Sequence, residues 1–225
     1  MTANSLLPAL SLTGITVVIG FKFLDYFWSR TQNPIPSVKF LCFRRLVGAL
    51  FYWVVPFFLF HALDLKLTLH DIGLNFEFTP ASVALSLAVI CVFLGLGFYA
   101  PQKCTNSSEL NKIPTNEFPK SYWIAWGLYL FSYETFYRGI LFLPLVNENS
   151  LLNAIIVSSF FYFVAHIGDP PAEILGALIM APIFIGISLL SKSIYLAFLI
   201  HLSIPVLIEY FSNQENKRRH SHDSR

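Results

Sequence analysis

The sequence is poor in charge and in cysteine. Only 12% of its 225 residues are Asp, Glu, Lys or Arg, against about 25% in an ordinary soluble domain. The three cysteines, Cys42, Cys91 and Cys104, have neither the spacing of metal ligands nor that of a disulfide framework. Hydrophobic residues reach 55%, which is more than a soluble domain of this size can bury. The composition therefore excludes a soluble domain, a disordered chain and a nucleic-acid-binding protein, and it indicates a protein embedded in the lipid bilayer.

Long apolar runs predict an all-α fold, a polytopic bundle of about seven transmembrane helices. Alternation of apolar and polar residues, as in β-barrel strands, is missing from these runs, which leaves helices as the only spanning structure. The expected spans are residues 6–28, 46–63, 80–100, 121–146, 151–168, 174–191 and 193–211. We expect one integral-membrane domain over residues 1–211 and a basic cytoplasmic tail over residues 212–225.

Basic residues in the loops predict the orientation, because cytoplasmic loops carry an excess of Lys and Arg. Eleven of the 15 basic residues fall after the first span, after the third span or in the tail. The opposite side holds only Lys66 and Lys192. We therefore expect a multi-pass protein of the cell membrane with its N-terminus outside and its C-terminus in the cytoplasm.

Four ionisable residues fall inside the expected spans: Glu134, Arg138, His166 and His201. Such groups are costly in a bilayer, which makes them functional candidates by default. Glu134 and Arg138 are four residues apart, so they share a helix face and can pair. The spacing leaves open whether this pair is structural or holds a carboxylate ionised at a site.

The two histidines and Glu134 come from three different spans, and together they allow two kinds of hydrolytic site. Carboxylate and imidazole groups can bind Zn²⁺ through three protein ligands, leaving one position open for catalysis. Alternatively, the carboxylate deprotonates a water molecule while the imidazoles stabilise the developing oxyanion. Both routes hydrolyse a peptide bond, and the spacing does not choose between Zn²⁺ and a site without a cofactor.

The depths of these residues in the membrane limit which of them can meet. Glu134 lies ~20 Å into its span at 1.5 Å per residue, whereas His166 is near the cytoplasmic end of its own span. The two meet only if the fourth span begins inside the cytoplasm or the fifth continues past Gly168.

Two further acidic groups have alternative interpretations. Lys22 and Asp25 are three residues apart near the cytoplasmic end of the first span, which predicts either a structural pair or snorkelling. Glu173 opens the sixth span, where the helix dipole favours an acid; the alternative is a second carboxylate facing His166.

Three stretches carry a family resemblance. They are Tyr133-Glu134-Thr135-Phe136-Tyr137-Arg138-Gly139, Tyr162-Phe163-Val164-Ala165-His166, and Gly186 to His201. In order, they resemble the Glu-Glu-x-x-x-Arg, Phe-x-x-x-His and His-x-x-x-Asn/Asp motifs of the CPBP (ABI) family of CAAX prenyl endopeptidases and bacteriocin-processing and immunity proteins. Asp71-Ile72-Gly73-Leu74 resembles a connector common in that family, so the resemblance covers roughly residues 70–211.

The resemblance implies an intramembrane endopeptidase that cleaves a membrane-embedded or lipid-modified peptide reaching its cavity from the cytoplasmic side. It implies that Glu134 activates water, that Arg138 holds Glu134 charged, and that His166 and His201 bind the oxyanion or a metal ion.

Two departures mark a divergent member. Tyr133 replaces the first Glu, which is usually taken as the water activator, and Pro205 replaces the Asn or Asp. The departures support an alternative, a catalytically inactive membrane partner or immunity protein with the same fold. A small transporter that uses Glu134 and Arg138 as an ion site is a third reading.

Overall fold

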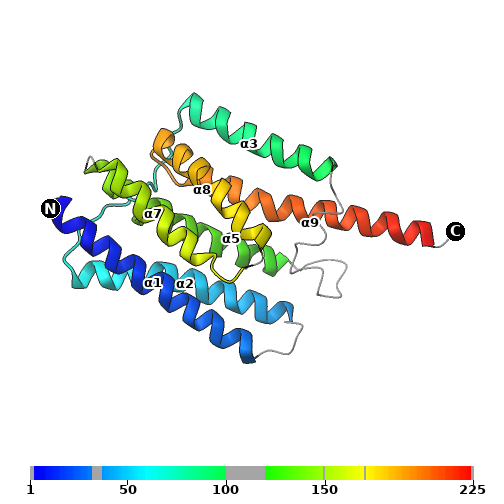
Figure 1. Cartoon of the computed structure of the whole chain (residues 1–225), viewed down its shortest axis with the longest axis horizontal. Coiled ribbons are helices and arrows are strands. Elements are labelled where there is room, and N and C mark those ends of the chain that lie inside the picture. The colour runs from blue at the N-terminus through cyan, green and yellow to red at the C-terminus, as the bar shows by residue number, and fades with distance from the viewer. Residues whose placement is uncertain (1–2, 32–36, 100–119, 149, 170, 224–225) are drawn as a thin grey trace.

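The computed structural model describes residues 3–31, 37–99, 120–148, 150–169 and 171–223. These residues form helices and connecting turns, with no strand among them, which confirms the all-α fold (Figure 1). The helices are α1 (Ala3–Thr31), α2 (Val38–Ala62), α3 (Pro80–Tyr99), α5 (Lys120–Glu134), the π-helix η2 (Thr135–Ile140), α6 (Leu143–Asn147), α7 (Leu151–Ala165), α8 (Pro171–Ser191) and α9 (Tyr195–Asp223).

Each of the seven expected spans coincides with a helical part of the chain. Three stretches are long and apolar enough to cross a bilayer, namely Leu6–Trp28, Val38–Ala62 and Ile174–Ser191. Shorter apolar helices occur in α3, α7 and α9. The expected span 121–146 is divided among α5, η2 and α6. Hydrophobic length alone does not reveal such a division, because all three parts are apolar.

The second span begins at Val38 rather than at residue 46. The side chain of Ser37 accepts a hydrogen bond from the backbone N–H of Phe40 and so caps the first turn. The basic residues Arg44 and Arg45, which the sequence analysis assigned to a loop, therefore lie on the helix.

The helices pack around two apolar clusters. One joins α1, α2, α5, η2, α6, α7 and one face of α8, and the other joins α3, α8 and α9. Large apolar side chains such as Phe23, Phe57 and Leu152 point outward and are mostly exposed. A surface of this kind suits lipid rather than water as the surrounding solvent.

Helix α9 runs without a break from the bundle to Asp223 and projects beyond the other helices (Figure 1). The described part of the expected tail over residues 212–225 is thus helical. Residues 100–119, with Cys104, lie outside the described part of the chain.

A close backbone approach joins the connector Asp71–Leu74 to the π-helix. A Cβ atom on Gly139 would lie 2.5 Å from the carbonyl oxygen of Ile72. The connector is itself anchored, because the carbonyl of Gly73 accepts a hydrogen bond from the Ile194 N–H at 3.1 Å. The glycine after Arg138 is therefore what allows the connector to lie against η2.

Substitution Gly139→Ala should lower the free energy of unfolding by about 1–3 kcal/mol, because neither backbone can yield to the added methyl group. Gly127→Ala on α5 is the matched control, since nothing lies within 4 Å of its added Cβ. This control should be neutral or stabilising by about 0.5–1 kcal/mol. Thermal unfolding in detergent micelles measures both variants, and equal melting temperatures would contradict the proposed contact.

Candidate active site

Glu134 and Arg138 form a buried ion pair at the junction of α5 and η2. Arg138 Nε lies 3.5 Å from Glu134 Oε2, and both side chains are 0% exposed. The predicted i,i+4 pairing is therefore confirmed. The π-helix begins directly after Glu134, and short π-helical segments are frequent at functional sites.

Arg138 also connects this junction to α7. Its Nη1 donates to Ser158 Oγ at 3.0 Å, and Ser158 Oγ in turn donates to the carbonyl of Tyr137 at 3.0 Å. The guanidinium lies over the Tyr162 ring, 4.8 Å from its centroid. These contacts hold the positive charge in one place beside Glu134.

His201 of α9 completes this group. Its Nδ1 lies 2.5 Å from Glu134 Oε1, and its ring packs beside those of Phe184 and Tyr133 at centroid distances of 5.3 and 5.6 Å. The side chain of His201 is 19% exposed. Glu134 is therefore buried, while the imidazole that is hydrogen-bonded to it is partly accessible.

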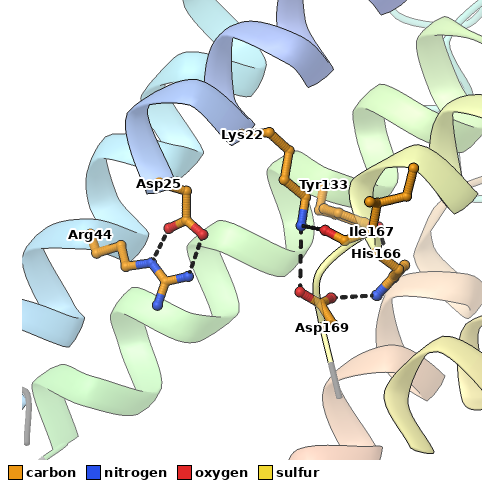
Figure 2. Close-up of polar contacts among 7 residues, drawn as sticks. All are labelled: Lys22, Asp25, Arg44, Tyr133, His166, Ile167 and Asp169. Carbon is orange, nitrogen blue, oxygen red and sulfur yellow. Dashed lines mark hydrogen bonds and ion pairs between the residues drawn. The ribbon is translucent and has the colours of Figure 1, made fainter. Parts of the chain in front are cut away.

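His166 follows the last residue of α7 and has two polar partners (Figure 2). Its Nδ1 lies 2.9 Å from Asp169 Oδ2, and its Nε2 lies 3.3 Å from the Tyr133 hydroxyl. Glu134 is not among the hydrogen-bond or ion-pair partners of His166 in the described part of the chain. Tyr133, the neighbour of Glu134 on α5, makes the link instead.

A cavity of about 520 Å³ brings the two histidines to one space. His166, His201 and Tyr133 line this cavity, together with residues from α1, α2 and α8. Glu134 and Arg138 do not line it; they lie behind His201. The structure thus gathers one acid and two imidazoles around a common pocket, with the acid in the second layer.

The start of α5 lies at the end of the bundle where α2 carries its basic residues. The Arg45 guanidinium, near the start of α2, lies 3.6 Å from the centroid of the Trp126 ring and 4.9 Å from that of Tyr122. The first turns of α5 therefore lie beside the basic end of α2. The cavity extends from this end of the bundle down to His201.

Lys22 and Asp25 do not pair with each other, so that prediction is wrong. Lys22 Nζ lies 3.4 Å from Asp169, whereas Asp25 forms a two-point ion pair with Arg44 of α2 (Figure 2). Partners on neighbouring helices compete with the local i,i+3 partner, and here they are preferred.

Asp169 is the site residue that the sequence analysis missed. Gly168 has a φ of +92°, a left-handed conformation that glycine adopts without strain, and it turns the chain so that Asp169 faces His166. The signal available in the sequence was His166-Ile167-Gly168-Asp169, an i,i+3 pair across a glycine at a helix end. The Glu173 side chain, considered for this position, lies outside the described residues.

The described residues do not gather a zinc site. They contain no group of three or more His, Cys, Asp or Glu side chains that could hold a metal ion. Glu134, His166 and His201, expected as alternative Zn²⁺ ligands, are divided between two hydrogen-bonded pairs.

The fold and this site define a class, a polytopic helical membrane protein with a buried acid–imidazole pair at an internal cavity. Residues 118–207 match the family model described as type II CAAX prenyl endopeptidase Rce1-like. The match supports the resemblance to the CPBP family over this part of the chain. It includes all four predicted site residues but not the connector at Asp71–Leu74. No curated protein and no solved structure gives a significant match to the chain.

Proposed function

We propose that the protein is an intramembrane endopeptidase of the CPBP type, which hydrolyses a peptide bond in a membrane-embedded or lipid-modified substrate. The observation that carries this proposal is the placement of His166 and His201, from separate helices, on one cavity among the helices. The family match over residues 118–207 supports the reaction class.

In this proposal His201 stabilises the oxyanion. A carboxylate only accepts hydrogen bonds, so the Nδ1 of His201 donates to Glu134 and its Nε2 is left for the cavity. The imidazolium form, paired with Glu134, donates its Nε2–H to the oxygen of the tetrahedral intermediate. Arg138 forms an ion pair with Glu134 on the side away from His201 and balances its charge.

His166 accepts the proton of the attacking water, and the resulting hydroxide adds to the carbonyl carbon. When the C–N bond breaks, His166 returns the proton to the leaving nitrogen, which yields a carboxylic acid and an amine; transfer of the acid's proton to the amine then gives a carboxylate and an ammonium group. The family resemblance implies water activation by Glu134. The burial of Glu134 behind His201 supports an indirect contribution through that imidazole instead.

The substrate enters from the cytoplasmic side in this proposal. Lys22, Arg44 and Arg45 line the cavity at the end where α1 finishes and α2 begins. Arg44 and Arg45, which belong to the basic residues predicted to be cytoplasmic, lie on the described start of α2 at this same end. The placement supports an N-terminus outside and a cavity that opens toward the cytoplasm.

The proposal is tested with purified protein in liposomes. A peptide with a prenylated cysteine near its C-terminus and a transmembrane peptide serve as substrates, and mass spectrometry identifies the products. We expect cleavage of at least one peptide by the natural sequence and none by the double variant His166→Ala/His201→Ala. If the natural sequence binds either peptide but neither it nor the double variant hydrolyses any, the result would favour the catalytically inactive alternative.

A further inference from the structure

The carboxylate of Asp169 lies directly behind His166, in the turn between α7 and α8. We propose that Asp169 is a positioning residue that orients His166 as the proton acceptor of the reaction. This inference rests on the proposed function, and it adds to the site a residue outside the three family motifs.

The geometry determines which nitrogen of His166 carries the proton. Asp169 Oδ2 lies 2.9 Å from Nδ1, and because a carboxylate cannot donate, Nδ1 must be the donor. Nε2 is then the unprotonated nitrogen, and it faces the Tyr133 hydroxyl at 3.3 Å. Because Nε2 carries no hydrogen, the Tyr133 hydroxyl donates to it, and a water molecule must take the place of this hydroxyl to give its proton to the Nε2 lone pair.

Asp169 is itself held from a third helix (Figure 2). Lys22 of α1 places its Nζ 3.4 Å from Asp169 Oδ1 and donates to the Ile167 carbonyl at 3.1 Å. Partial burial alone would raise the pKa of Asp169. The hydrogen bond with His166 and the charge of Lys22 outweigh burial and lower that pKa, so the group stays a carboxylate.

This arrangement supplies a negative charge that the first motif lacks. Tyr133 stands where the family pattern has its first Glu, and a neutral phenol cannot stabilise an imidazolium as a carboxylate does. Asp169 contacts the other ring nitrogen, Nδ1, of the same imidazole. His166 therefore still has a carboxylate partner, which comes from the turn after α7 rather than from α5.

Substitution Asp169→Asn should lower kcat by about 10²-fold, within the range that a positioned base contributes, and should change KM by less than about twofold. Asp169→Glu, which keeps the charge, should recover at least a tenth of the natural kcat. Asp64→Asn is the matched control, because Asp64 is exposed, pairs with Lys66 and does not line the cavity. A kcat that falls equally in the Asp64 and Asp169 variants would overturn the inference.

A second measurement does not depend on cleavage. Nitrogen-15 NMR of ring-labelled histidines in detergent micelles, with His166→Gln to assign the signal, reports which nitrogen is protonated. We expect a protonated Nδ1 in the natural sequence and a shift of the proton to Nε2 in Asp169→Asn, whose amide can donate. An identical His166 signal in both proteins would overturn the inference. The expected shift together with no cleavage of any peptide would support positioning by Asp169 and count against the peptidase reaction alone.

Discussion

Substitution Glu134→Ala should lower the free energy of unfolding by about 3–5 kcal/mol, the largest stability effect we expect at any single position. The carboxylate is the partner of a guanidinium that is 0% exposed. Removing one member of such a pair strands the other as a buried, uncompensated charge. Unfolding in mixed micelles of increasing denaturing detergent measures the loss.

A double-mutant cycle tests whether the stranded charge is the cause. Glu134→Ala/Arg138→Met removes both charges and should be markedly less destabilised than the sum of the two single variants. The matched control is the pair Asp64 and Lys66, which lies 3.9 Å apart at an exposed position. Asp64→Ala should be close to neutral. Strictly additive effects of Glu134→Ala and Arg138→Met would show that the two groups are not coupled.

This expectation decides which variant is suitable for activity measurements. An alanine at position 134 confounds lost catalysis with lost stability. Glu134→Gln keeps the shape and an acceptor oxygen for His201, so a fall in its kcat at unchanged fold would report the contribution of the charge through His201.

The substitutions His166→Ala and His201→Ala should each lower kcat by about 10²–10⁴-fold, the range for a general base or a preorganised donor. Both side chains are partly exposed to the cavity, so their removal leaves the apolar clusters intact. The rate of peptide cleavage in liposomes measures the effect, and the elution profile in size-exclusion chromatography reports the fold.

His61→Ala is the control for these variants. His61 is exposed at the far end of α2 from the basic residues that line the cavity, and its removal should leave kcat unchanged. Natural rates in either His166→Ala or His201→Ala would refute the role proposed for that residue.

Much of the fold and half of the site could be predicted from local features. The seven apolar runs coincide with helical segments, and the i,i+4 spacing of Glu134 and Arg138 correctly predicted their ion pair. The pairing of Lys22 with Asp25 was wrong, because the prediction used sequence distance and ignored residues of neighbouring helices. Lys22 meets Asp169, which is 147 residues away along the chain.

The depth of the groups could not be predicted for a related reason. Helical rise places Glu134 far below His166, yet Tyr133 spans the difference by pointing from α5 to Nε2 of His166 at 3.3 Å. Adjacent residues on a helix differ in direction by about 100°. Tyr133 therefore lines the cavity while Glu134 faces Arg138 and His201 away from it.

Composition and apolar length by themselves determined that this protein is a helical membrane bundle. The free energy of transferring a segment from water to lipid depends on the residues of that segment alone. The order and spacing of three motifs indicated the resemblance to the CPBP family, and the family match over residues 118–207 supports it. Only the tertiary structure decided which carboxylate supports which imidazole, Glu134 behind His201 and Asp169 behind His166. Such pairings depend on how separate helices pack and how one glycine turns the chain, and neither is a property of any single segment.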